Sequence, residues 1–169
     1  YRDARGRPGR KPRMQGTVID RDGRVIGWHD KTIPTGGDLK WCSRGEPRRL
    51  RVFRTGGLTF GATICNDFWA TPLYTTLPDL NLPVVLAAKG ARVIFHAIAS
   101  GTGRAYLDFH TRRIEERAIR AGVWVVSANA VSGRSPSNVP SGIVDPRGRW
   151  RARAPLAGEH LLVGSVSLT

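Results

Sequence analysis

Three apolar runs of strand length constrain the fold of this chain most. Leu58–Ile64, Ala91–Ala99 and Val123–Ala128 are rich in β-branched and other apolar residues, which is typical of strands buried inside a sheet. Between the second and third runs, Arg104–Ala121 carries apolar side chains at helical spacing, and Gly122 ends the predicted helix. Strands that alternate with helices predict an α/β or α+β fold with a mixed sheet.

Two hairpins are predicted around this centre. Residues 17–20 and 25–28 are β-rich and flank Asp22-Gly23, a strong hairpin signal. A second pair, Ser141–Val144 and Trp150–Ala152, flanks the turn 145–148. The other predicted elements are a strand over Leu50–Arg54, a short helix over Val84–Lys89 that Gly90 ends, and a closing strand over Leu161–Leu168. Long Gly- and Pro-containing loops such as 32–46 tend to be functional.

The chain is strongly basic, with 27 Lys and Arg against 13 Asp and Glu in 169 residues, a formal net charge of +14. An excess of this size makes nucleic acid the first partner to consider. The basic residues are scattered and do not follow one helix as a stripe with interleaved aromatic residues, so we favour solvated faces over a nucleic-acid groove. Residues 1–14 are Gly-, Pro- and Arg-rich and predict a flexible basic arm or loop.

Several classes of protein are disfavoured by composition. The longest apolar runs, such as Leu82–Ala88, are broken by Pro or Lys far short of the about 20 residues that a membrane-spanning helix needs. We therefore expect no membrane partner and a cytoplasmic location. Cys42 and Cys65 are the only thiols, and the four His residues show no metal-ligand spacing with Cys or Asp. No metal and no cofactor are predicted.

Cys65 is the sharpest candidate for chemistry. It follows a predicted buried strand where the chain turns, and α/β folds present reactive groups at the carboxyl ends of their strands. A thiolate nucleophile needs a nearby cation or base, and Lys31 opens the long loop after the first hairpin. On the pattern alone, a buried and inert core thiol remains the alternative.

Five segments, in order along the chain, resemble motifs of the nitrilase, or carbon–nitrogen hydrolase, superfamily. They are Gly23–Lys31, Gly57–Asp67, Lys89–Ile94, Arg117–Asn129 and Ser141–Gly148. Each match is weak alone, but together they are specific and span roughly residues 15–168. The resemblance implies an α-β-β-α sandwich.

The resemblance also implies an activity. Enzymes of this family attack a small amide, carbamoyl compound or nitrile through a cysteine thioester, and amidase activity is commoner among them than nitrilase activity. By the same resemblance, Cys65 is the nucleophile, Lys31 is the cation that stabilises thiolate and oxyanion, and the backbone N–H of Asn66 is a second oxyanion donor. A homo-oligomer is implied as well.

The chain departs from the family pattern in its acidic residues. The family places a general-base Glu before the Lys, whereas the four Glu residues here all follow Lys31. We therefore expect residues 15–169 to be a partial, N-terminally truncated carbon–nitrogen hydrolase domain that is inactive by itself. A second family Glu lies between the Lys and the Cys, and Asp38 takes the nearest place.

Further residues have both a functional and a structural interpretation. Trp69 and Ser100 are candidates for lining the substrate pocket, and Trp69 is equally compatible with the core. Asp67 is predicted as a turn or N-cap acceptor that shapes the chain at Cys65, and His96 as a core histidine. Two other classes of function stay open: a non-catalytic subunit with a nitrilase-type fold and, least favoured, a basic nucleic-acid-binding protein.

Overall fold

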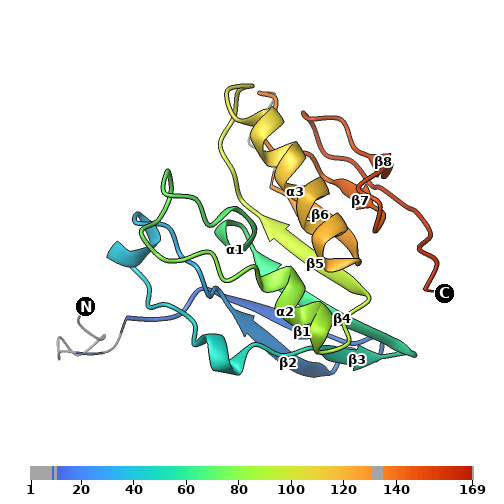
Figure 1. Ribbon diagram of the computed structural model, residues 1–169, viewed down its shortest axis with the longest axis horizontal. Helices are drawn as coiled ribbons and strands as arrows, with labels where there is room; N and C mark the ends of the chain where they lie inside the picture. Colours follow the sequence, from blue (N-terminus) through green and yellow to red (C-terminus); the bar gives the residue numbers. More distant parts are fainter. Residues whose placement is uncertain (1–8, 10, 131–134, 169) are drawn as a thin grey trace.

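The computed structural model describes residues 9, 11–130 and 135–168. Helices cover one face of a six-stranded sheet, and a two-stranded hairpin lies on the opposite side (Figure 1). The strands are β1 (Gln15–Ile19), β2 (Val25–Asp30), β3 (Phe53–Thr55), β4 (Leu58–Ile64), β5 (Val93–Ile98), β6 (Trp124–Asn129), β7 (Gly142–Val144) and β8 (Trp150–Arg153). The helices are α1 (Asn66–Trp69), α2 (Leu82–Ala88) and α3 (Leu107–Ala121), with 3₁₀ turns at Asp38–Lys40 and Pro47–Arg49.

The three predicted apolar runs form the centre of the six-stranded sheet. Its strand order is β3-β4-β5-β6-β7-β8. The central strands β4, β5 and β6 are parallel, with Thr63 opposite His96 and His96 opposite Ser127. The connections between them run through the helices, as parallel pairing requires, while β3, β7 and β8 pair antiparallel at the two edges. The predicted α/β class is therefore confirmed, and both predicted hairpins are present.

The main core lies between the helices and the sheet. Leu86 of α2, Ile94 of β5 and Ile114 of α3 are each fully buried there. Gly61 of β4 permits the close approach of α2, because a Cβ at this position would lie 2.7 Å from Leu86 Cδ1 and 2.9 Å from Ile94 Cδ1. Burial of several large apolar side chains, at about 1.5–3 kcal/mol each, fixes the helices on this face.

Several predicted boundaries are shifted by a few residues; helix α3, for example, begins at Leu107 and not at Arg104. Strand β3 begins at Phe53 and not at Leu50, because Pro47–Arg49 form a 3₁₀ turn and Leu50 is buried behind it. Helix α2 begins at Leu82 and so includes Pro83, a residue that the first turn of a helix tolerates well.

The predicted closing strand over Leu161–Leu168 is wrong. These residues form no strand, and Leu161 and Val163 are 92% and 81% exposed. The segment is held from the side, since Trp124 Nε1 donates to the Ser167 carbonyl at 2.8 Å. The sheet ends at β8, and this segment adds no further strand to it.

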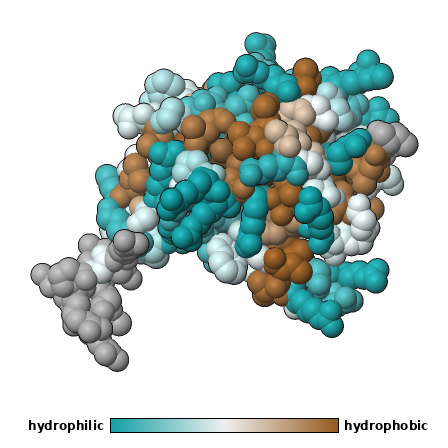
Figure 2. Space-filling model, turned by 60° about the horizontal axis from the view of Figure 1, so that its bottom comes forward, coloured by the Kyte–Doolittle hydropathy of each residue, from teal (hydrophilic) through white to brown (hydrophobic). Residues whose placement is uncertain are grey.

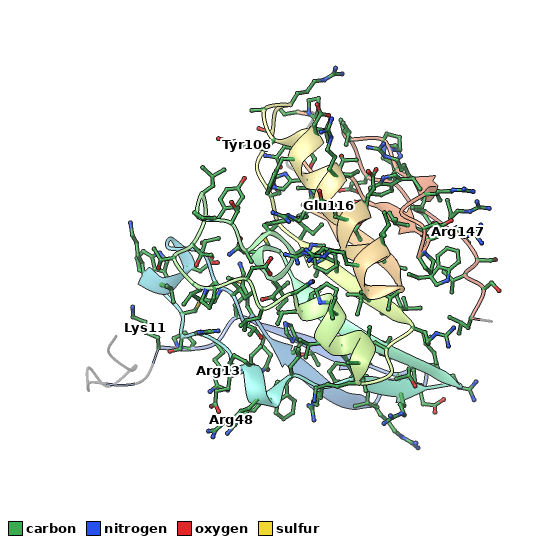
Figure 3. All side chains as sticks on the ribbon, in the orientation of Figure 1. Lys11, Arg13, Arg48, Tyr106, Glu116 and Arg147 are labelled. Carbon is green, nitrogen blue, oxygen red and sulfur yellow. The ribbon has the colours of Figure 1, made fainter. Side chains whose placement is uncertain are left out.

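The described part of the predicted basic arm lies against the body of the molecule. The Ser43 N–H donates to the Pro12 carbonyl and the Lys31 N–H to the Met14 carbonyl. Arg13 bridges Asp30 at 2.7 Å and Glu46 at 2.8 Å. Figure 3 shows Arg13 and Arg48 on the same side of the molecule. Residues 1–8 and 10, where most of the predicted arm falls, lie outside the described residues.

The face of the sheet opposite the helices is only partly covered. A cavity of about 490 Å³ lies between β1 and this face of the sheet. Its lining is mainly apolar and includes Val18 of β1 and Phe60 of β4. Phe95 of β5 is 41% exposed on the same face, and Trp28 of β2 is 49% exposed. Figure 2 shows hydrophobic side chains exposed among hydrophilic ones on the side that carries the hairpin.

A buried arginine connects α3 to the segment that follows β4. Arg117 has no exposed surface. Its guanidinium donates to the Phe68 carbonyl at 3.1 Å, to Asn81 Oδ1 at 2.8 Å and to Asp79 Oδ2 at 2.7 Å. A buried arginine requires such partners, because desolvation of an unpaired charge is costly.

Replacement of Arg117 by Met is expected to destabilise the fold. The change leaves the Phe68 carbonyl without its donor and removes the ion pair with Asp79, so we expect the free energy of unfolding to fall by about 3 kcal/mol in urea titrations. Arg120→Met, at an exposed position on the same helix, is the matched control and should change it by less than about 0.5 kcal/mol. Equal effects of the two changes would contradict this account.

Candidate active site

Cys65 stands at a strained turn between β4 and α1. Its backbone angles are φ 45° and ψ −104°, a region that non-glycine residues rarely enter and that costs about 1–3 kcal/mol. The Cys65 N–H donates to the Ala97 carbonyl of β5 at 2.8 Å, and the Cys65 carbonyl accepts from the Phe68 N–H at 3.1 Å. The turn is thus fixed on both sides, and the thiol is held at the carboxyl end of the parallel strands.

Asp67 holds this turn against the segment that carries Lys31. It is fully buried, and its Oδ2 accepts from the Ile64 N–H at 2.9 Å and contacts His29 Nε2 at 2.7 Å. Its Oδ1 accepts from the N–H groups of Thr32 and Ile33 at 2.9 and 2.8 Å. The predicted turn acceptor is therefore present, but α1 has no side-chain cap. The larger role of Asp67 is to join two segments 35 residues apart.

Lys31 and Asp38 are brought into direct contact. Lys31 is 4% exposed, and its Nζ donates to Asp38 Oδ2 at 2.6 Å. Burial by itself would raise the pKa of the Asp38 carboxyl, but the hydrogen bonds from Lys31 and Thr35 hold that pKa below its usual value. The carboxylate therefore fixes the position of a buried ammonium group.

A pocket of about 270 Å³ opens beside the thiol. Three of the predicted site residues, Cys65, Trp69 and Ser100, line it together. Lys31, Asp38 and Asn66 are not among its lining residues. Gly101, predicted with Ser100 to line the pocket, is also present, and the residues that the sequence did not assign to it are Thr35, Tyr74, Ala99, Tyr106, His110 and Asn138. Tyr106 and His110 are four residues apart at the start of α3, a spacing that could have indicated a shared helix face.

Asn66 is fully buried directly after the thiol. Its Nδ2 donates to the Ile33 carbonyl at 2.9 Å, while its Oδ1 has no hydrogen-bond partner. In the described part of the chain, the backbone N–H of Asn66 has no hydrogen-bond acceptor either.

His96 is a core residue, as predicted. It is stacked on Phe68 with ring centroids 4.0 Å apart, and its Nδ1 lies 3.0 Å from Thr63 Oγ1. Its Nε2 is buried without a partner. Burial lowers the pKa of His96 to about 3, and the positive charge of Lys31 contributes to the shift. The native protein therefore keeps this imidazole neutral.

The described residues 9, 11–130 and 135–168 contain no group of three His, Cys, Asp or Glu side chains that could hold a metal ion. Over the same residues, no helix is long and apolar enough to cross a membrane.

The comparisons with known proteins identify the family. A sequence profile described as carbon–nitrogen hydrolase matches residues 3–169, so the chain belongs to that family. No curated protein matches the chain.

Solved structures share the fold. A carbon–nitrogen hydrolase from Helicobacter pylori G27 is 17% identical with a TM-score of 0.71, and the match covers 87% of this chain and 54% of that one. Nit3 of Saccharomyces cerevisiae, a member of branch 10 of the nitrilase superfamily, is 25% identical with a TM-score of 0.65 over 86% and 50% of the two chains. An amidase variant from Nesterenkonia sp. AN1, with acrylamide added at its active-site cysteine, is 19% identical with a TM-score of 0.67 over 85% and 53%. The chain thus spans about half the length of these proteins.

Asp67→Asn tests the junction between the Cys65 turn and the Lys31 segment. An amide NH₂ cannot accept, so at least one buried N–H loses its acceptor, and we expect a loss of about 2 kcal/mol of unfolding free energy in urea titrations. Asp20→Asn is the control, because Asp20 accepts from the backbone N–H groups of Asp22 and Arg24 in an exposed turn. An unchanged stability of the Asp67 variant would contradict the proposed junction.

The buried neutral His96 predicts a dependence of stability on pH. The unfolded chain takes up a proton at His96 near pH 6.5 and the native chain only near pH 3, so the free energy of unfolding should fall as the pH drops between these values. His96→Leu should reduce that slope by about 1.4 kcal/mol per pH unit. His160→Leu, at an exposed position, should leave the slope unchanged. Equal slopes for wild type and His96→Leu would contradict the conclusion that His96 is buried and neutral in the native protein.

Proposed function

We propose that this member of the carbon–nitrogen hydrolase family is a thiol-dependent hydrolase of small non-peptide amides, with Cys65 as its nucleophile. The observation that carries the proposal is the strained turn at Cys65, which places the thiol at the carboxyl end of the parallel strands and in the wall of a pocket. Strain of this kind clusters at functional sites, where the surrounding structure maintains it. The Nesterenkonia amidase, in which acrylamide adds to the active-site cysteine, supports the same choice of nucleophile.

In the proposed acylation step, the Cys65 thiolate attacks the carbonyl carbon of the amide. A carbon–sulfur bond forms, the carbonyl electrons move to oxygen, and the oxyanion accepts a hydrogen bond from the Asn66 N–H. Lys31 supplies the positive charge that favours both thiolate and oxyanion, and Asp38 holds its ammonium group in place. The oxyanion electrons then re-form the carbonyl as the carbon–nitrogen bond breaks, the nitrogen takes up a proton from solvent and departs as ammonia or an amine, and a thioester remains on Cys65.

Water completes the reaction in the proposed scheme. It attacks the thioester carbon, gives up a proton to a base, and releases the carboxylic acid and the Cys65 thiolate. The Glu that the family resemblance implies does not precede Lys31 in this sequence. We therefore propose that the 169 residues by themselves form the thioester faster than they hydrolyse it. Amides are preferred over nitriles in this proposal, and a homo-oligomer stays a prediction.

A non-catalytic subunit of the same fold is the alternative function. The buried pair of Lys31 and Asp38 argues against it. Lys31 is 4% exposed, and removing an ammonium group and its carboxylate partner from water costs desolvation free energy that apolar packing would not require. The reactivity of the Cys65 thiol separates the two functions, because a thiol without a catalytic role does not need a cation that favours the thiolate.

Alkylation of the thiols by iodoacetamide at pH 7 tests the proposal. We expect Cys65 to react at least about tenfold faster than an ordinary thiol, because thiolate is the reactive species. Lys31→Met should slow the reaction about tenfold, whereas Lys40→Met, which removes an exposed lysine of the same loop, should not.

The buried Cys42 is the internal control in this experiment. Mass spectrometry of the labelled peptides separates the two cysteines, and Cys65→Ala reports the background from Cys42. Ordinary reactivity of Cys65, or the same rate in Lys31→Met and wild type, would favour the non-catalytic subunit.

A further inference from the structure

The pocket beside Cys65 has an aromatic wall. Trp69 follows the thiol in α1, Tyr74 lies in the loop after α1, and Tyr106 precedes α3, yet all three line the same cavity. The rings of Tyr74 and Tyr106 meet edge to face with centroids 6.3 Å apart and an angle of 67° between their planes. Figure 3 places Tyr106 beside the start of α3. Three segments of the chain therefore contribute rings to the lining, with Trp69 buried at 2% exposure and Tyr106 accessible at 42%.

His110 completes this wall as a neutral ring. Its centroid lies 4.6 Å from that of Trp69 and 6.1 Å from that of Tyr74, where the two planes are nearly parallel at 11°. Its Nδ1 lies 2.9 Å from the Asn138 carbonyl, which can only accept, so the proton is on Nδ1. Nε2 is then the acceptor, 3.4 Å from the Tyr74 hydroxyl. Burial lowers the pKa of His110 and keeps the ring uncharged.

The opposite side of the pocket is polar but already hydrogen-bonded. Ser100 donates to Asn138 Oδ1, and the Ser100 N–H donates to Asn129 Oδ1 at 3.1 Å. In the described part of the chain, Asp, Glu, Lys and Arg do not line the cavity. The pocket thus offers an uncharged, partly aromatic lining beside the thiol, and Tyr106 is its most exposed ring at 42%.

We propose that this pocket binds the acyl group of an aromatic carboxamide, such as a benzamide, with its ring against Tyr74 and Tyr106. Ring pairs with centroids about 4.5–7 Å apart are favourable beyond their buried area, and the existing wall has spacings in this range. The volume of about 270 Å³ is just below the about 300–1,000 Å³ of typical ligand sites, which suits one ring. The inference rests on the proposed function in one respect: Cys65 is taken as the group that attacks the amide carbonyl of the bound ligand.

Protection of Cys65 from iodoacetamide tests the inference without requiring turnover. Benzamide and cyclohexanecarboxamide are matched probes, because they have the same number of heavy atoms and differ in whether the ring is flat. We expect benzamide to give half-protection at a concentration about three- to tenfold lower than cyclohexanecarboxamide, the ratio that a ring–ring contact provides. Glutamine, with a charged acyl group, should protect least.

Variants of Tyr106 show whether the wall is responsible. Tyr106 is 42% exposed and makes no side-chain cap bond, so Tyr106→Leu should fold and should bring the ratio close to one. Tyr106→Phe keeps the ring and should keep the ratio. Phe95→Leu, at an exposed ring on the opposite face of the sheet, should also keep it.

The outcomes separate this inference from the proposed function. Equal protection by the two carboxamides, better protection by glutamine, or no protection by any of them would overturn the aromatic acyl site, whatever the labelling rate of Cys65. Slow labelling of Cys65 together with a preserved preference for benzamide would instead overturn the hydrolase and retain the site.

Discussion

The site depends on the four polar contacts of one buried carboxylate, Asp67. Two of them hold the N–H groups of Thr32 and Ile33, one holds the N–H of Ile64 at the end of β4, and one joins His29 of β2. A carboxylate without exposed surface is tolerated only when its oxygens are fully hydrogen-bonded, so these groups cannot separate independently. The strained turn at Cys65 and the segment that carries Lys31 are therefore parts of one cooperative unit.

The rest of the fold supports that unit from the helix side. Arg117 fixes the carbonyl of Phe68, the residue after Asp67, to α3, and Phe68 in turn stacks on the neutral His96 of β5. Gly61 lets α2 lie close against β4, which ends at the Cys65 turn. A densely packed interior has low compressibility, so the surrounding contacts maintain the positive φ at Cys65 in the native state.

The sequence was sufficient for the central elements and insufficient for the pocket. The parallel strands, α3 with its Gly122 cap and both hairpins follow from local periodicity and turn residues, and the motif resemblance indicated the family. The strand predicted over Leu161–Leu168 was wrong because an apolar, β-branched composition does not by itself ensure strand pairing, and the segment is held instead by a side-chain contact from Trp124. Tyr74, Tyr106 and His110 could not be assigned to one pocket, since loop and helix bring them together through tertiary packing. The contact between Lys31 and Asp38, and the junction at Asp67, likewise depend on segments whose relative placement local patterns do not define.

The central claim is that Cys65 becomes acylated by a small amide, and peptide mapping by mass spectrometry tests it most directly. The chain is incubated with a primary carboxamide, quenched in acid and digested, and the position of any acyl adduct is mapped. The account predicts a thioester on the peptide that contains Cys65, with loss of the amide nitrogen, and no such adduct in Cys65→Ser. Absence of an adduct in the wild-type chain, or an adduct on Cys42 alone, would contradict it.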